Sequence, residues 1–204
     1  MTLANRTLVS LWVSLALVAC TNNEEPSRPV EEPSVTGSLQ KARALVESAI
    51  GPRLDLRILA HSDDGSVVYG TQREAPPNSD ATIAFDATWL SAKPGARPVP
   101  IDLGPIQGAT IAPSGDRVAV VTSDARSLHL WSPSGDEHLD DDAMPGVTFS
   151  PDGARLVYAR GPAPELDIYA ITLQSRQKAR LTVDPAPDYL PAYSRDGSEV
   201  AFVS

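Results

Sequence analysis

From Leu54 to Ser204, short runs of alternating apolar and polar positions are separated by clusters of turn residues. An alternation with a period of two is typical of strands that bury one face. The stretch Thr148–Arg160 shows this arrangement most clearly, because the turn sequence SPDG at Ser150–Gly153 stands between two apolar runs. Proline at the second position presets φ for a type I turn, and glycine at the fourth position accepts the left-handed conformation. The stretch therefore predicts a strand, a tight turn and an antiparallel strand.

This turn occurs four times along the chain. The copies lie at Ser62–Gly65, Ala112–Gly115, Ser150–Gly153 and Ser194–Gly197, and their glycines are separated by 50, 38 and 44 residues. The residue three positions after each glycine is apolar in every copy: Val68, Val118, Leu156 and Val200. A sequence period near 40 residues that carries short strands is typical of the four-stranded blades of a β-propeller. The sequence thus predicts an all-β protein built from antiparallel blades.

The third copy continues with Glu165–Leu173 (ELDIYAITL) and Lys178–Thr182 (KARLT), and the fourth opens with Tyr189–Gly197 (YLPAYSRDG). Together with SPDG, these motifs resemble the repeats of the TolB C-terminal propeller, a subgroup of the WD40-like propellers with PD40 repeats. The resemblance covers residues 54–204. No counterpart of the N-terminal α/β domain of TolB is evident, so the resemblance implies a TolB-like propeller rather than TolB itself.

The four copies supply about three and a half blades, because the fourth copy contributes two strands before Ser204. Propellers close with four to eight blades. Three interpretations stay open: a truncated piece of a longer propeller, a small propeller that closes with N-terminal strands, or a half-blade that pairs with another chain. We favour the truncated propeller, because Val200–Val203 would otherwise be a bare apolar edge that is prone to aggregation.

Residues 1–19 are expected to be a lipoprotein signal peptide. Arg6 supplies a positive charge, and the apolar run Leu8–Ala19 is too short to span a bilayer as a helix. The run ends in Leu17–Cys20 (LVAC), which resembles the bacterial lipobox. The resemblance implies that Cys20 is the lipid attachment site, with palmitate among its acyl chains, and that it becomes the mature N-terminus. A plain signal peptide is the alternative, but the only cysteine stands where the lipobox requires it.

A tether and one helix are expected between the signal peptide and the propeller. Residues 20–37 are rich in Pro, Glu and Ser and predict a disordered tether. Residues 38–51 predict a short amphipathic helix that Ser38 caps and Gly51 ends. Thr21 is not the aspartate that retains lipoproteins at the inner membrane in enteric bacteria. The lipobox resemblance therefore implies the periplasmic side of the cell envelope, with the outer membrane favoured.

The composition and the motifs give little indication of catalysis. The net charge of −9 argues against nucleic acid as a partner. No G-x-S-x-G, P-loop or G-x-G-x-x-G motif occurs, so the sequence predicts no catalytic residue and no cofactor. The three histidines lack the short spacing of a zinc pair, and no metal site is predicted at His61, His129 and His138. The acidic run Asp136–Asp142 lacks the order of an EF-hand and predicts a solvated loop between blades rather than a calcium site.

The main hypothesis is a non-enzymatic cell-envelope lipoprotein that presents a propeller as a protein-binding scaffold. The TolB resemblance implies a protein partner, the peptidoglycan-associated lipoprotein, and a membrane attachment through the N-terminal lipid. The alternative is the propeller portion of an exported serine peptidase that resembles prolyl oligopeptidase, whose catalytic domain lies outside this sequence. A surface protein that binds a sugar or an ion is neither supported nor excluded. No binding residue of the resembled family can be matched in this chain.

Overall fold

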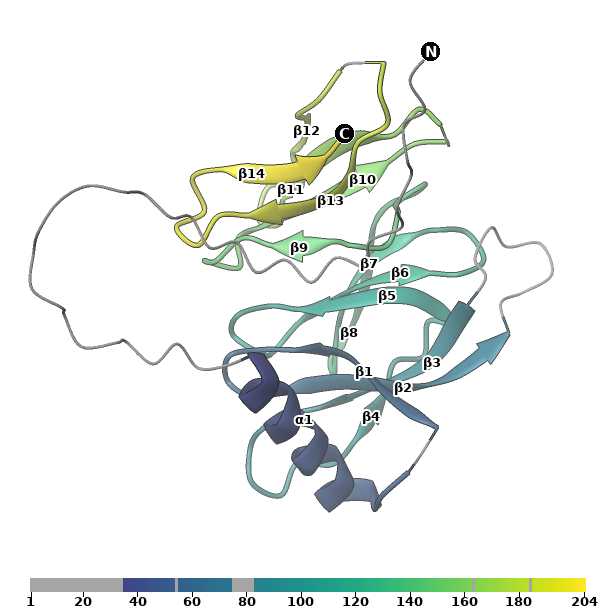
Figure 1. Ribbon diagram of the computed structural model, residues 1–204, viewed down its shortest axis with the longest axis vertical. Coiled ribbons are helices and arrows are strands. Elements are labelled where there is room, and N and C mark those ends of the chain that lie inside the picture. Colours follow the sequence, from purple (N-terminus) through teal and green to yellow (C-terminus); the bar gives the residue numbers. More distant parts are fainter. Residues whose placement is uncertain (1–34, 54, 75–82, 163, 184) are drawn as a thin grey trace, which may run out of the picture. The chain divides into compact units, whose positions relative to one another are not determined.

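The computed structural model describes residues 35–53, 55–74, 83–162, 164–183 and 185–204. In these residues the protein is mostly β-structure with one N-terminal helix, and its strand pairs are antiparallel (Figure 1). The signal peptide at residues 1–19 and most of the tether at residues 20–37 lie outside the described residues.

The helix α1 spans Val35–Ile50 and begins three residues before the expected cap at Ser38. Gly37 lies within the helix, which tolerates a glycine at a cost of about 1 kcal/mol relative to alanine. The buried face of α1 is narrow: Ala42 and Val46 are buried, whereas Leu39 stays exposed. The helix packs through this narrow face onto the first two strands of the sheet.

The strands follow the four copies of the turn, and we call the strands of each copy a blade. Blade 1 comprises β1 (Leu56–His61), β2 (Val67–Glu74), β3 (Ile83–Leu90) and β4 (Val99–Pro100). Blade 2 comprises β5 (Ile106–Ile111), β6 (Val118–Thr122), β7 (Leu128–Ser132) and β8 (Gly135–Asp140). Blade 3 comprises β9 (Thr148–Phe149), β10 (Arg155–Arg160), β11 (Asp167–Thr172) and β12 (Lys178–Arg180). Blade 4 has two described strands, β13 (Tyr189–Tyr193) and β14 (Val200–Val203).

Each blade is an antiparallel meander in the order of the sequence. Blades 1 and 2 are joined into one sheet by the single residue pair Phe85–Ile106, between β3 and β5. Blade 3 forms a four-stranded sheet, and blade 4 forms a two-stranded sheet. The first strands of successive blades contact each other, β1 with β5, β5 with β9 and β9 with β13. The strand number per copy agrees with the sequence prediction of three full blades and one half-blade.

The four turns have the predicted geometry. All four glycines lie in the left-handed region, with φ values of 89°, 74°, 68° and 73° at Gly65, Gly115, Gly153 and Gly197. Each glycine N–H donates to the carbonyl of the first turn residue, at 2.8 to 3.0 Å. In the third copy, Ser150 Oγ also donates to Asp152 Oδ1 at 2.5 Å and accepts the backbone N–H of Arg155 at 2.9 Å. The serine and aspartate therefore lock the turn by side-chain hydrogen bonds, in addition to favouring its backbone conformation.

The second strand of each full blade is buried on both faces, because neighbouring layers cover both. In β6, Val118 and Val120 pack into the cluster shared with blade 1, whereas Ala119 and Val121 pack into the cluster shared with blade 3. In β10, Leu156 and Tyr158 face blade 2, and the alternate residues face blade 4. A strand between two apolar layers needs apolar residues on both faces, which explains the continuous runs in the middle of each copy.

Arginines connect consecutive turns. Arg117, two residues after the glycine of copy 2, donates through its Nη2 to the carbonyl of Gly153 at 3.2 Å. Arg155, at the same place in copy 3, donates to the carbonyl of Gly197 at 3.2 Å and lies over the ring of Tyr193, 5.4 Å from its centroid. Hydrogen bonds from charged donors are stronger than neutral ones, so these contacts hold neighbouring blades at a fixed spacing.

Candidate functional site

The acidic run Asp136–Asp142 lies at the boundary between blades 2 and 3. Its first five residues belong to β8, so the prediction of a loop is wrong for Asp136 to Asp140, although Asp136 to His138 are solvent-exposed. Arg176 of blade 3 binds Glu137 through two nitrogens, and Arg126 binds Asp142 at 3.0 Å. The backbone of Asp136 to Asp140 pairs with β7, and positive groups oppose the carboxylates of Glu137 and Asp142.

Asp140 is the most buried member of this run, with its side chain 6% exposed. It accepts a hydrogen bond of 2.6 Å from the hydroxyl of the fully buried Tyr158, and its other oxygen lies 2.7 Å from Lys178 Nζ. Arg160 lies at 3.4 Å. Burial raises the pKa of Asp140, but the hydrogen bonds from Lys178 and Tyr158 outweigh it and leave this pKa below its usual value. Burial, followed by the hydrogen bond to Asp140, raises the pKa of Tyr158 far above its usual range.

All three histidines lie in strands, and two of them are neighbours across a strand pair. His61 is exposed at the end of β1, whereas His129 and His138 lie opposite each other on β7 and β8. Their rings meet edge to face with centroids 5.3 Å apart. His129 Nδ1 is hydrogen-bonded to Asp136, and His138 Nε2 is hydrogen-bonded to Asp141. In the part of the chain that the structure describes, no group of three or more His, Cys, Asp or Glu side chains is arranged to hold a metal ion.

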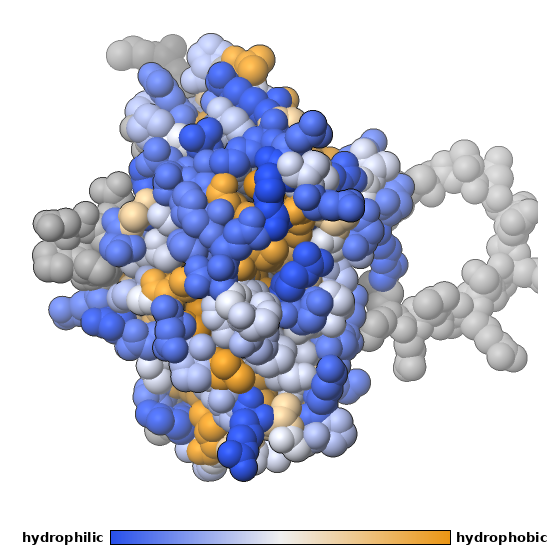
Figure 2. All heavy atoms as spheres, turned by 180° about the vertical axis from the view of Figure 1, so that it is seen from behind, coloured by the Kyte–Doolittle hydropathy of each residue, from blue (hydrophilic) through white to orange (hydrophobic). Residues whose placement is uncertain are grey.

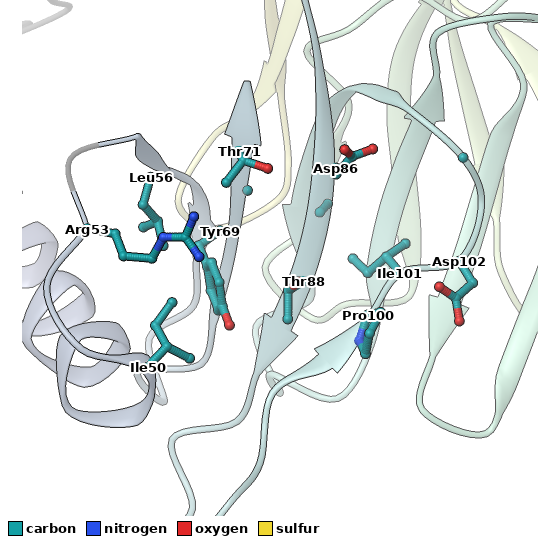
Figure 3. A pocket seen from close by; sticks show the side chains of 13 residues that line it. Ile50, Arg53, Leu56, Tyr69, Thr71, Asp86, Thr88, Pro100, Ile101 and Asp102 are labelled. Carbon is teal, nitrogen blue, oxygen red and sulfur yellow. The ribbon is translucent and has the colours of Figure 1, made fainter. Parts of the chain in front are cut away.

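One feature suited to recognition is a hollow of about 500 Å³ on blade 1 (Figure 3). Its floor is the face of β2 and β3 that points away from blade 2, and its polar lining comprises Arg53, Tyr69, Thr71, Asp86, Thr88 and Asp102. The opposite face of the same strands carries Val68 and Ala87, which pack against blade 2. The helix α1 covers the neighbouring part of the outer face, where its Val46 packs in one cluster with Leu90 of β3. The hollow is therefore the part of the outer face of blade 1 that α1 leaves open.

The hollow presents paired charges and one aromatic hydroxyl. Arg53 lies beside Tyr69 of β2 (Figure 3). It forms an ion pair of 2.9 Å with Asp55, which raises the pKa of Arg53 and lowers that of Asp55. Burial raises the pKa of Tyr69, although a hydrogen bond with Thr88 opposes the shift. Asp86 is exposed at the rim, 3.0 Å from Arg73. Such a mixed surface suits the polar groups of a peptide or protein better than an apolar small molecule.

Sequence reasoning named no residue of this hollow. Cys20, the one site residue that it did name, lies outside the described residues. The signal that was available is the outward position of Tyr69, Thr71, Asp86 and Thr88 on two paired strands. To use that signal, one must know which residues of β2 and β3 are paired. The sequence does not give this pairing register, because a long segment separates the two strands.

Among the described residues, no helix has the length and apolar character needed to cross a bilayer.

The fold and the turn geometry define the chain as a β-propeller protein with an open face on its first blade. Among solved structures, a protein described as TolB from Agrobacterium tumefaciens aligns with 72% of this chain and 53% of its own length, with a TM-score of 0.51 and 21% identity. TolB from Acinetobacter baumannii aligns with 86% of this chain and 43% of its own length, with a TM-score of 0.50 and 17% identity. Tricorn protease aligns with 72% of this chain and 18% of its own length, with a TM-score of 0.52 and 12% identity. The fold is therefore like the propellers of TolB and tricorn protease.

No protein-family model matches the sequence. One curated relative does: Tricorn protease homolog 1 of Streptomyces coelicolor is 31% identical over 144 residues. The alignment covers 68% of this chain and 13% of the relative. The chain thus spans about half of the Agrobacterium protein and a small part of the Streptomyces protein, so that it corresponds to a portion of each.

Proposed function

We propose that this protein is a non-enzymatic, lipid-anchored β-propeller of the bacterial cell envelope that binds another protein through blade 1. The observation that carries the proposal is the open hollow on the outer face of β2 and β3. The blades hold this face rigidly, because apolar clusters on both sides of each second strand fix their spacing. The structural likeness to TolB, which the sequence motifs also indicate, supports a role as a scaffold.

The chemistry of the hollow favours a partner with polar side chains and main-chain groups. Asp86 and Asp102 are exposed carboxylates, while Arg53 and Thr71 supply hydrogen-bond donors. Tyr69 contributes a largely buried ring whose hydroxyl belongs to the same surface. Protein interfaces combine a buried aromatic anchor with a polar rim in this way. We infer that the partner contacts both strands at once and extends over the rim at Asp86.

Replacing Asp86 by lysine is expected to weaken partner binding about tenfold, because it reverses a rim charge and places a cation next to Arg73. Binding is measured as the amount of partner that the immobilised full chain retains from detergent-solubilised envelope. Asp124→Lys is the matched control, because Asp124 is exposed on a turn of blade 2. Equal retention by both variants, or no retained protein on the unmodified chain, would contradict the proposed binding face.

Replacing Cys20 by serine is expected to abolish lipid attachment, because the thiol is the group that a lipobox cysteine uses. Cells that express the unmodified chain with radioactive palmitate should show a labelled band, and the variant should show none. The variant should also lose the membrane attachment that the lipid supplies. Retention of the label in the variant would exclude Cys20 as the attachment site.

A second candidate is the propeller portion of an exported peptidase. The identity of 31% to Tricorn protease homolog 1 supports it, and the chain covers 13% of that relative. The two candidates differ in what the native gene produces. A fluorophosphonate probe that labels a native product heavier than 21.6 kDa would support the peptidase, whereas an unlabelled product no heavier than 21.6 kDa would support the scaffold.

A further inference from the structure

The two outer strands of blade 2, β7 and β8, bring two histidines together. His129 and His138 are directly opposite each other in the antiparallel pair, and their ring centroids are 5.3 Å apart. Two imidazoles on one tetrahedral ion, with metal–nitrogen distances of about 2.0–2.1 Å, have ring centroids about 5 Å apart. The strand pair therefore holds the rings at the separation that a shared metal ion requires. Both strands belong to a blade in which all four strands are present.

Aspartates determine which nitrogen of each ring carries the proton. His129 Nδ1 lies 3.1 Å from Asp136 Oδ2, and His138 Nε2 lies 2.9 Å from Asp141 Oδ1. An ionised carboxylate only accepts hydrogen bonds, so each of these nitrogens donates, and the other nitrogen of a neutral ring keeps its lone pair. A histidine that binds a metal ion commonly donates its second nitrogen to a carboxylate in this way. The lone pairs left for a metal ion are those of His129 Nε2 and His138 Nδ1.

The same two aspartates place negative charge beside the rings. The side of the molecule in Figure 2 has a mainly polar surface, so exposed carboxylates alone do not mark a binding site. The other carboxylates of the acidic run, at Glu137, Asp140 and Asp142, are each paired with an arginine or a lysine. Among the described residues, Asp136 and Asp141 form no ion pair with an arginine or a lysine, and their ionisable partners are the two histidines. A divalent cation between the rings would offset these two carboxylates.

We propose that His129 and His138 together bind one divalent transition-metal ion, such as Zn²⁺ or Cu²⁺, both of which accept imidazole nitrogen. Two protein ligands leave further coordination positions for water, and the side chain of His138 is 50% exposed, so water reaches the site. Such a site differs from the groups of three or more ligands that the described residues lack. The spacing of the histidines along the chain predicts no zinc pair, because strand pairing joins them. The site lies outside the hollow on blade 1, so this inference can fail while the proposed function holds.

Isothermal titration calorimetry of the full chain with zinc chloride tests the proposal. All samples carry Cys20→Ser, which removes the only thiol, and are purified without a histidine tag. The parent chain should bind one Zn²⁺ ion, and His129→Gln or His138→Gln should each weaken binding at least about tenfold. His61→Gln is the matched control and should bind as the parent does, because His61 lies on β1 and outside the pair.

A third variant and a second ion distinguish coordination from a merely structural role of the pair. Asp141→Asn removes the charge behind His138 and should weaken zinc binding about tenfold. With one equivalent of Cu²⁺, electron paramagnetic resonance should show coupling to two imidazole nitrogens in the parent chain and to one in His138→Gln. The proposal would be overturned if the parent showed no saturable zinc binding up to about 1 mM. Parent-like zinc binding by any of the three variants, or a two-nitrogen signal that persists in His138→Gln, would overturn it as well.

Discussion

Replacing Asp140 by alanine is expected to lower the free energy of unfolding by about 2 kcal/mol, since a buried hydroxyl that loses its acceptor costs about 1–3 kcal/mol. Asp140 is the acceptor for the hydroxyl of Tyr158 at 2.6 Å and the counter-ion of Lys178 at 2.7 Å. Tyr158 is fully buried, so its hydroxyl cannot turn to water when the acceptor is lost. Urea unfolding followed by tryptophan fluorescence measures the change. Asp63→Ala, on an exposed turn, should change stability by less than about 0.5 kcal/mol.

The effect of Asp140→Ala should depend on pH. The pKa of Asp140 in the folded chain lies below its ordinary value of 3.8. The stability that this carboxylate contributes through its ionisation is therefore fully present above pH 3.8 and is lost as the pH falls through the lowered pKa. The difference between the unmodified chain and the variant should shrink in acid. A difference that stays constant, or grows, down to the acid unfolding transition would show that the carboxylate is not stabilised by its partners.

Leu156→Ala should cost about 3 kcal/mol, whereas Val200→Ala at the equivalent position of blade 4 should cost about 1 kcal/mol. Both residues lie three positions after a turn glycine, but Leu156 is fully buried between blades 2 and 3 and Val200 is only partly buried. Urea unfolding at low protein concentration compares the two variants. Equal losses would contradict the difference in packing between blades 3 and 4.

The repeat architecture could be predicted from the sequence because local chemistry determines it. The turn at Ser150–Gly153 needs a glycine with positive φ, and the observed value of 68° at Gly153 confirms the prediction. The apolar residue three positions later begins the buried strand, as Leu156 shows. Both signals lie within six residues of each other, so no long-range pairing had to be known. Four copies of a local signal were enough to predict three full blades and a half-blade.

The acidic run and the hollow could not be predicted because their properties come from distant residues. Glu137 is neutralised by Arg176, which lies 39 positions further along the chain, and no sequence period relates the two. The run was therefore expected to be a solvated loop, although Asp136 to Asp140 form a strand. The hollow likewise combines Arg53, after α1, with Asp86 of β3 and Asp102, after β4. A single sequence carries no signal for such a convergence.

The arginine contacts between turns have a consequence for how such chains evolve. Arg117 and Arg155 each donate to the main-chain oxygen of a glycine in the following copy, at Gly153 and Gly197. A main-chain oxygen is present whatever side chains the next copy carries. The arginine therefore requires no particular side chain in the neighbouring copy. A duplicated repeat inserted by unequal recombination would find its acceptor already in place. For this contact, chains of this type can therefore gain or lose modules without a compensating mutation at the new junction.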